Sequence, residues 1–231
     1  KNLMNQIKKL KINIYEKELE KKRTQLDFLK LQINPHFYLN CLTTINSMAQ
    51  TQNYMEIERM TLSTTRYFRY LFQSRTDYVP LYRELENVND YLIIQKLRLG
   101  DIFEYDFMKE GEIDNVAIPP LILQTFIENT LKYAFSSDKK LKLYLYCSLV
   151  NENTKKFLRV QISDNGPGYP PDILAALQSN QPITGSDGTR IGIANVIKRL
   201  QLLYEEQSVV DFENLIGGGA SITVDLPYKV Y

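Results

Sequence analysis

The sequence predicts two unlike domains, an α-helical dimerisation hairpin over residues 1–79 and an α+β two-layer sandwich over residues 80–231. Two observations point to this fold class. Between Ile12 and Ile33, apolar residues recur at alternating steps of three and four, which is the seam of a helix that packs on other helices. Further along the chain, strand-like alternation of apolar and polar residues is mixed with a few amphipathic helices, as in a sheet covered by a helical layer.

The hairpin is predicted to pair with a second copy of itself. Its first helix is expected to run from near Lys1 to about Gln50, and its second helix is expected to end before Val79-Pro80. The second helix has bundle-spaced positions at Ile57, Met60, Thr64, Tyr67 and Leu71. A first helix of this length has an apolar seam with no partner in its own sequence, so we expect a four-helix bundle in a homodimer.

The elements of the sandwich are marked by proline, glycine and turn residues at their boundaries. Pro119-Pro120 is expected to open one of its helices, because proline is tolerated in a first turn. The expected helices cover residues 81–99, 121–135, 171–178 and 193–203. The expected strands cover residues 102–107, 141–149, 157–163, 208–213 and 220–226. Residues 179–190 are polar and without periodicity, which predicts a mobile loop.

The composition excludes several classes of function. The formal net charge is +1, so no basic surface argues for nucleic acid as a partner. Cys41 and Cys147 have no metal-ligand spacing and are expected to be reduced structural cysteines of a cytosolic protein. No apolar run approaches the ~20 residues that cross a bilayer, and no signal peptide is expected in these residues. Because the chain begins inside a predicted helix without a methionine, we expect an upstream region.

The first helix changes character at the single histidine, His36. From there a polar row continues at the helical spacing, through His36, Asn40, Thr43, Ser47 and Gln50. Pro35 removes one backbone donor just before the histidine, so a local kink is expected to present the imidazole. A histidine on a helix is by itself more often a plain surface residue. The row becomes informative only in combination with the second domain.

Three stretches of the second domain have residues suited to a nucleotide. Asn129 offers a neutral oxygen for a hard cation such as Mg²⁺, and Lys132 a point charge for phosphate, with Tyr133 beside it. The stretch Asp164–Gly168 ends a strand, where glycines admit a flat ligand and a carboxylate can accept a hydrogen bond from an exocyclic amine. The stretch Gly188–Gly192 opens the last helix, whose first amides suit phosphate. Each stretch alone could also have a purely structural role, such as an ordinary turn at Asp164–Gly168.

Taken in order, these stretches resemble the catalytic core of bacterial sensor histidine kinases, specifically the LytS/YesM-type subgroup. The resemblance spans Leu26 to Pro227. The four matching boxes are Gln32–Phe37 (the phosphoacceptor box), Ile118–Asn129 (the N box), Asp164–Gly168 (the first glycine box) and Gly188–Asn195 (the second glycine box). The resemblance implies that the second domain has the ATPase fold shared by gyrase, Hsp90 and histidine kinases.

The resemblance also implies roles for single residues. His36 would take the γ-phosphoryl group of ATP and pass it to an aspartate of a response regulator, and Asn40 would orient the water that removes phosphate from that regulator. Asn129 would hold Mg²⁺, and Asp164 would bind the adenine amine. The residues expected to face the phosphates or to shape the pocket wall and lid are Lys132, Tyr133, Gly166, Gly168, Gly188, Arg190 and Gly192. The protein would be the cytoplasmic portion of a membrane sensor, attached to the membrane only through its upstream region.

Some positions depart from the family pattern. Arg190 replaces the middle glycine of the second glycine box, where a side chain either touches phosphate or crowds the lid. Thr130 stands where the family prefers a small apolar residue, Tyr133 where this subgroup has histidine, and Ala220 follows Gly219 where threonine is usual. Two alternatives therefore stay open: a nucleotide-binding pseudokinase scaffold, and an ATPase of the same fold that does not phosphorylate a histidine.

Overall fold

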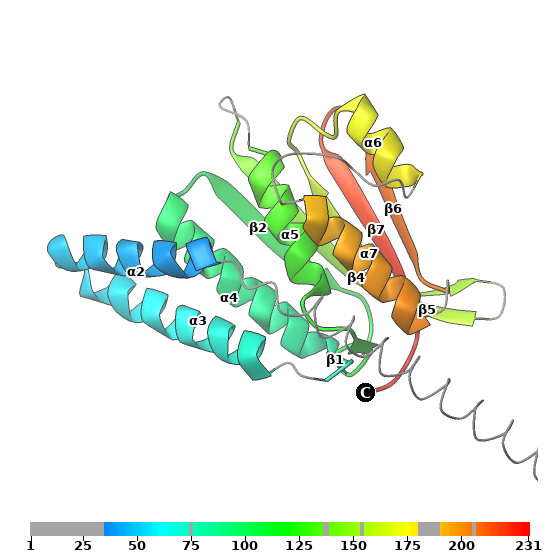
Figure 1. Ribbon diagram of the computed structural model, residues 1–231, viewed down its shortest axis with the longest axis horizontal. Coiled ribbons are helices and arrows are strands. Elements are labelled where there is room, and N and C mark those ends of the chain that lie inside the picture. The colour runs from blue at the N-terminus through cyan, green and yellow to red at the C-terminus, as the bar shows by residue number, and fades with distance from the viewer. Residues whose placement is uncertain (1–34, 74–75, 136–138, 153–154, 180–189, 205–206) are drawn as a thin grey trace, which may run out of the picture. The chain divides into compact units, whose positions relative to one another are not determined.

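The computed structural model describes residues 35–73, 76–135, 139–152, 155–179, 190–204 and 207–231 (Figure 1). The apolar seam from Ile12 to Ile33 and the upstream side of the predicted kink at Pro35 lie outside these ranges, as does most of the loop predicted over residues 179–190. The predictions of a continuous first helix and of a mobile loop are therefore not tested. Residues Pro35–Tyr231 form one unit.

Helices α2 (Pro35–Gln50) and α3 (Tyr54–Gln73) form the hairpin expected from the sequence. The two helices pack along one apolar face, which on α2 includes the buried residues Phe37, Cys41 and Met48. The polar row that starts at His36 lies on the other side of α2, where every member is exposed except the half-buried Asn40. The sequence pattern therefore separated the packed face of this helix from its open face.

Helix α4 (Leu81–Leu99) connects the hairpin to the sandwich. It ends where predicted, because Gly100 adopts a left-handed φ of 80° and donates its N–H to the carbonyl of Lys96. Helix α4 contacts α3 on one side and α5 (Ile122–Tyr133) on the other. Because α4 belongs to both packing interfaces, the predicted domain boundary between residues 79 and 80 stays a prediction.

The sandwich is built on a five-stranded sheet in the order β2-β4-β5-β7-β6. Its strands are β2 (Phe103–Lys109), β4 (Leu141–Glu152), β5 (Lys155–Asp164), β6 (Val209–Asn214) and β7 (Ala220–Pro227). Strand β2 pairs with β4 in parallel, and the other neighbours are antiparallel. The last residue of β5, Asp164, lies opposite Leu143 of β4, so the first glycine box begins at the edge where β5 leaves the sheet.

One face of the sheet holds the core. Helices α5 and α7 (Arg190–Tyr204) lie side by side across this face, and α6 (Pro171–Gln178) contacts β6 (Figure 1). Alternate residues of β4 are fully buried under these helices, namely Leu141, Leu143, Leu145 and Cys147. The intervening Lys142 and Tyr144 are exposed on the opposite face. This alternation is that of a sheet covered on one side, and the predicted fold class is confirmed.

The start of α5 differs from the prediction. Pro119-Pro120 does not form the first turn; the helix begins at Ile122, after Leu121 in a left-handed conformation with φ 66°. The buried carboxylate of Glu84 accepts the backbone N–H groups of Leu121 at 2.9 Å and Leu123 at 3.1 Å. A side chain of α4 thus satisfies the free amides at this helix start, which the local sequence does not reveal.

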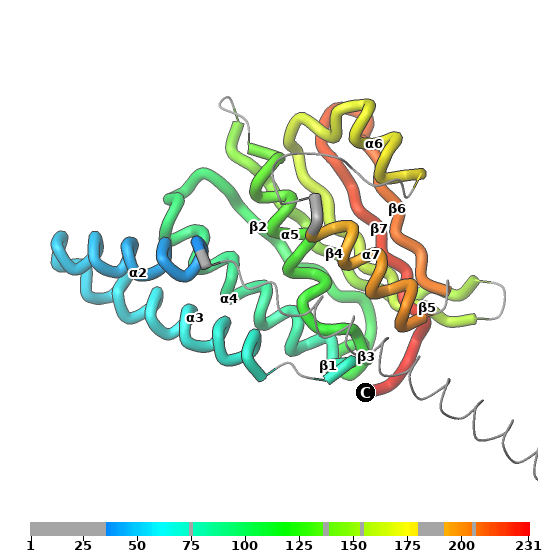
Figure 2. Tube along the Cα trace, viewed as in Figure 1, coloured from blue at the N-terminus to red at the C-terminus, as the bar shows by residue number. Residues whose placement is uncertain are grey.

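A second, two-stranded sheet was not predicted. Strands β1 (Val79–Pro80) and β3 (Ala117–Ile118) pair antiparallel although almost forty residues separate them, and Figure 2 shows them side by side. Strands of two residues are too short to have a periodicity.

Within the described ranges, no helix is long and apolar enough to span a membrane.

Candidate functional site

The side-chain amide of Asn129, on helix α5, is the first group of the candidate site. Its Nδ2 donates a hydrogen bond of 2.6 Å to the carbonyl of Thr125, one turn earlier. Its Oδ1 is buried and has no hydrogen-bond partner among the described residues. A buried acceptor without a partner is unfavourable, and a neutral amide oxygen is a ligand that Mg²⁺ accepts. The environment of Asn129 therefore fits a divalent cation.

Asp164 lies at the end of β5 with a buried carboxyl group. Its Oδ1 accepts the backbone N–H groups of Gly166 at 2.8 Å and Ala220 at 3.3 Å, which fixes the plane of the carboxyl group. Neither of these hydrogen bonds uses Oδ2. Burial raises the pKa of Asp164, and the two amides oppose that shift. Asp164 thus presents one oriented acceptor oxygen, as recognition of an exocyclic amine requires.

The glycines that follow Asp164 are required by close contacts. A Cβ atom on Gly166 would lie 2.5 Å from the carbonyl oxygen of Ala134 at the end of α5, so only glycine lets the turn pass there. Gly168 has a left-handed φ of 79°, and a Cβ there would lie 2.8 Å from Oδ1 of Asn214. The first glycine box therefore packs directly against α5 and β6, which forms one wall of the site.

These elements enclose a pocket of about 440 Å³. Asn129 and Asp164 both line it, which brings together two residues predicted separately from the sequence. The remaining lining comes from α5, the glycine box, α6, α7 and β7, through Thr130, Tyr133, Ala134, Pro167, Gly168, Tyr169, Pro170, Pro171, Ile173, Leu177, Ile193 and Ala220. The pocket is largely apolar with two fixed polar groups, which suits a flat heterocycle.

Some residues that build the pocket were not predicted from the sequence. Asn214 of β6 holds the glycine box by accepting the N–H of Tyr169 at 2.7 Å and donating to its carbonyl at 2.9 Å. Ile173 and Leu177 of α6 line the pocket at helical spacing. The apolar spacing in α6 was visible, but nothing local distinguished a pocket wall from ordinary core.

The two residues predicted one turn after Asn129 have different positions. Tyr133 lines the pocket and is 46% exposed, so it lies at the rim. Lys132 is exposed and is not among the pocket-lining residues; its ammonium lies 5.2 Å from the centroid of the Tyr133 ring. Contact of Lys132 with phosphate stays a prediction.

The second glycine box is described only in part. Gly192 lies in the first turn of α7, where a Cβ atom would be 3.3 Å from Cγ2 of Thr125 and 3.9 Å from Nδ2 of Asn129. The backbone of Arg190 begins α7, whereas Gly188 lies outside the described residues. The helix start predicted to bind phosphate is therefore next to the predicted cation ligand.

The candidate phosphoacceptor lies on α2, away from the lining of the pocket. His36 is exposed, and its Nδ1 is 3.2 Å from Nδ2 of Asn40, one turn later. If the Asn40 amide is rotated so that its oxygen accepts from Nδ1–H, the lone pair of the neutral imidazole lies on Nε2. Asn40 is thus placed to select which ring nitrogen is nucleophilic.

Glu128 is adjacent to Asn129 but faces a different environment. Its Oε1 accepts a 2.7 Å hydrogen bond from Nε2 of Gln124, on the side of α5 that faces α3. Burial raises the pKa of the Glu128 carboxyl group. Glu128 is not among the residues lining the pocket.

Glu128→Gln is expected to flatten the pH dependence of stability. The raised pKa means that the folded chain keeps this proton at pH values where the unfolded chain, with a pKa near 4.5, has released it. This contribution to stability is fully present below that value and is lost as the pH rises through the folded-state pKa, with a slope of at most about 1.4 kcal/mol per pH unit. Chemical denaturation between pH 4.5 and 8 measures the difference. Glu112→Gln, at an exposed position, is the matched control, and parallel profiles for the two variants contradict the prediction.

Two family models match this chain. One, described as "Histidine kinase", matches residues 24–103, which include His36 and Asn40. The other, described as "Histidine kinase-, DNA gyrase B-, and HSP90-like ATPase", matches residues 118–230, which include every lining residue of the pocket. The chain belongs to the histidine kinases. The family predicted from the sequence is confirmed, and its ATPase domain implies ATP as the ligand.

Relatives among the histidine kinases include proteins named "Sensor protein LytS". That of Bacillus subtilis (strain 168) is 27% identical over 222 residues, which are 94% of this chain and 37% of that protein. That of Streptococcus mutans serotype c is 30% identical over 207 residues, which are 89% of this chain and 34% of that protein. The chain thus spans little more than a third of the length of these relatives.

A solved structure agrees with the fold. "ShkA full-length in complex with AMPPNP" is 15% identical, with a TM-score of 0.51, over 80% of this chain and 38% of that one. At this identity the match supports the fold alone.

Proposed function

We propose that the chain is the kinase core of a two-component sensor protein. It transfers the γ-phosphoryl group of ATP to His36 and then to an aspartate of a response regulator. The observation that carries this proposal is the combination, in one histidine kinase chain, of the exposed His36–Asn40 pair with a pocket that presents Asp164 and Asn129.

In the proposed complex, the adenine amine donates to Oδ2 of Asp164, while Oδ1 stays bonded to the two backbone amides. Oδ1 of Asn129 holds Mg²⁺, which neutralises charge on the phosphates. The first turn of α7 contributes backbone amides to the phosphates from Arg190 and Gly192. Lys132 and Tyr133 are proposed to meet the phosphates at the rim, and Gly188 to belong to the lid.

The proposed chemistry is a displacement at phosphorus. The lone pair of Nε2 of His36 attacks the γ-phosphorus atom, an N–P bond forms, the bond to the bridging oxygen breaks, and ADP leaves. With its amide rotated so that Oδ1 rather than Nδ2 faces Nδ1 of His36, Asn40 accepts from Nδ1–H during this step and so keeps the reactive lone pair on Nε2. Transfer of this kind requires mainly positioning and charge neutralisation, which the pocket residues and the cation supply.

Incubation of the untagged chain with γ-labelled ATP tests the proposal. Acid-labile label retained on the protein supports a kinase. Release of free phosphate without protein label identifies an ATPase, and neither product identifies a scaffold; both of these outcomes contradict the proposal.

Asn40→Ala is expected to separate two activities. Autophosphorylation should fall by no more than about threefold, because an exposed hydrogen bond between neutral groups contributes only about 0.5 kcal/mol. Removal of phosphate from the regulator should slow by tenfold or more, because the amide is proposed to orient the attacking water. The measurement is a pair of rate constants for each protein, with Ser47→Ala on the same exposed row as control. Equal losses in both rates would show that Asn40 acts only through His36.

The proposed assembly is a homodimer that docks a receiver domain of the regulator, with no nucleic acid. We further propose that it forms the cytoplasmic part of a membrane sensor, reached through an upstream region. Sedimentation of the chain checks the dimer, and a monomer mass contradicts it. Fractionation of cells that express the full-length protein checks the membrane attachment, and recovery in the soluble fraction contradicts it.

A further inference from the structure

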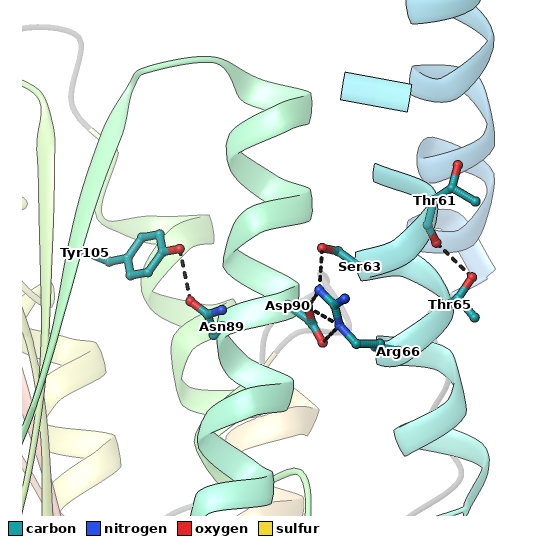
Figure 3. Close-up of polar contacts among 7 residues, drawn as sticks. All are labelled: Thr61, Ser63, Thr65, Arg66, Asn89, Asp90 and Tyr105. Atoms are coloured by element: carbon teal, nitrogen blue, oxygen red, sulfur yellow. Dashed lines mark hydrogen bonds and ion pairs between the residues drawn. The ribbon is translucent and has the colours of Figure 1, made fainter. Parts of the chain in front are cut away.

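An ion pair between Arg66 and Asp90 joins helix α3 to helix α4. Figure 3 shows the guanidinium of Arg66 against the carboxylate of Asp90, with Ser63 beside it. Nε of Arg66 lies 2.9 Å and 3.0 Å from the two carboxylate oxygens, and Nη2 lies 2.6 Å from one of them. The side chain of Arg66 is 55% exposed and that of Asp90 is 8% exposed, and the pair reaches no further than α4.

The next residue, Tyr67, reaches beyond α4 to the helix that holds the pocket. Nε2 of Gln124 on α5 donates to the Tyr67 hydroxyl at 2.5 Å and to Oε1 of Glu128 at 2.7 Å. Oε1 of Gln124 accepts from Nδ2 of Asn87 at 2.8 Å. We call Tyr67, Gln124 and Glu128 the amide relay. Tyr67 and Gln124 are buried, so water does not replace these hydrogen bonds.

The ring of Tyr67 also holds the phosphoacceptor end of α2. Phe37, the residue after His36, is buried with its ring centroid 5.1 Å from that of Tyr67 and 5.4 Å from that of Tyr91. One tyrosine therefore contacts α2 through its ring and α5 through its hydroxyl. The far end of the amide relay, Glu128, is the sequence neighbour of Asn129, which lines the pocket.

We propose that Tyr67 and Gln124 are positioning residues for phosphoryl transfer, because their buried hydrogen bond holds the His36 end of α2 in register with the helix that carries Asn129. This inference rests on the function proposed above. Neither residue lines the nucleotide pocket, so neither contributes to nucleotide affinity. A small misplacement of a nucleophile is enough to slow transfer, by about a hundredfold for 1 Å.

The decisive variant is Tyr67→Phe, which keeps the ring against Phe37 and removes only the hydroxyl. We expect the autophosphorylation rate at saturating ATP to fall about tenfold, while Kd for ATP changes by less than about twofold. Transfer from phosphorylated His36 to the regulator should be unchanged, because that step does not use the nucleotide pocket. A general loss of folding would instead slow both reactions and raise Kd for ATP.

The matched control is Tyr105→Phe. Its hydroxyl also bonds to a side-chain amide, at 3.2 Å from Oδ1 of Asn89, and the residue is half-buried like many in this region (Figure 3). That bond joins β2 to α4 and does not involve the hairpin. An equal loss of autophosphorylation in Tyr105→Phe and Tyr67→Phe overturns the proposal, as does a changed Kd for ATP in Tyr67→Phe.

Two further measurements keep the inference testable. If the hydroxyl acts through Gln124, the double variant of Tyr67→Phe with Gln124→Met should be no slower than Gln124→Met alone; multiplied losses overturn the inference. Amide hydrogen exchange near Phe37 should quicken in Tyr67→Phe but not in Tyr105→Phe. The exchange measurement does not depend on catalysis, so the two hypotheses can fail separately. A wild-type chain that takes up no phosphate label from ATP contradicts the proposed function. Unchanged amide exchange in Tyr67→Phe contradicts the positioning role of the amide relay.

Discussion

His36→Gln is expected to abolish acid-labile phosphorylation of the chain, a loss of about a thousandfold or more, while ATP binding stays within about twofold of wild type. A glutamine amide has no nucleophilic nitrogen, and loss of a nucleophile is among the most severe single changes in catalysis. His36 does not line the pocket, so nucleotide affinity has no reason to change. The measurements are label incorporation and calorimetry with ATP.

The composition of the chain makes this test unusually clear. His36 is the only histidine among 231 residues, so an untagged His36→Gln protein has no histidine left to label. Ser47→Ala, on the same exposed side of α2, should keep wild-type labelling. Acid-labile label at wild-type levels in His36→Gln would place the acceptor on another residue type and end the kinase proposal.

Asp164→Asn is expected to weaken ATP binding by up to about a hundredfold and to narrow the gap between ATP and GTP. If the variant amide oxygen keeps accepting from Gly166 and Ala220, its NH₂ group replaces Oδ2 and points at the adenine amine, so donor faces donor. A buried donor left unpaired costs about 1–3 kcal/mol. Guanine presents a carbonyl oxygen at this position. That oxygen cannot hydrogen-bond to the carboxylate of Asp164, because both groups are acceptors, but it can accept a hydrogen bond from the amide of the variant.

Calorimetry with both nucleotides on both proteins measures this effect. Asp172→Asn removes the same charge from an exposed position in the first turn of α6 and should leave both affinities unchanged. Equal wild-type affinity for GTP and ATP, or unchanged ATP affinity in Asp164→Asn, would reduce Asp164 to a turn residue.

The same carboxyl group predicts a pH dependence of binding. Burial raises the pKa of Asp164, so the proton returns at a higher pH than for an exposed aspartate. A proton on Oδ2 turns the acceptor into a donor, so ATP affinity should fall as the pH falls through that pKa, by at most about tenfold per pH unit. In Asp164→Asn this dependence should disappear. A profile with the same slope in both proteins assigns the titration to another group.

Periodicity along the chain was enough to predict the order and type of nearly all the elements, because helices and strands that bury one face repeat every 3.6 and every two residues. The residues of the first glycine box could also be predicted from the sequence. Gly166 and Gly168 occupy positions where a Cβ atom would collide with the carbonyl of Ala134 or the side chain of Asn214. Such steric requirements restrict the residue type, and a short box of restricted residues is recognisable from the amino-acid sequence alone.

The direction in which neighbouring side chains face depends instead on the packing of the folded chain. Glu128 and Asn129 are adjacent, yet Glu128 bonds to the amide of Gln124 on the side of Tyr67, while Asn129 lines the nucleotide pocket. Each step along a helix turns the side chain by about 100°, so a pair of polar residues serves two surfaces once other helices pack against it. The carboxylate of Glu84 accepts the amides at the start of α5, and β1 pairs with β3. Both contacts join groups that are distant in sequence. Local periodicity contains no information about such contacts, because they form only when the chain is folded.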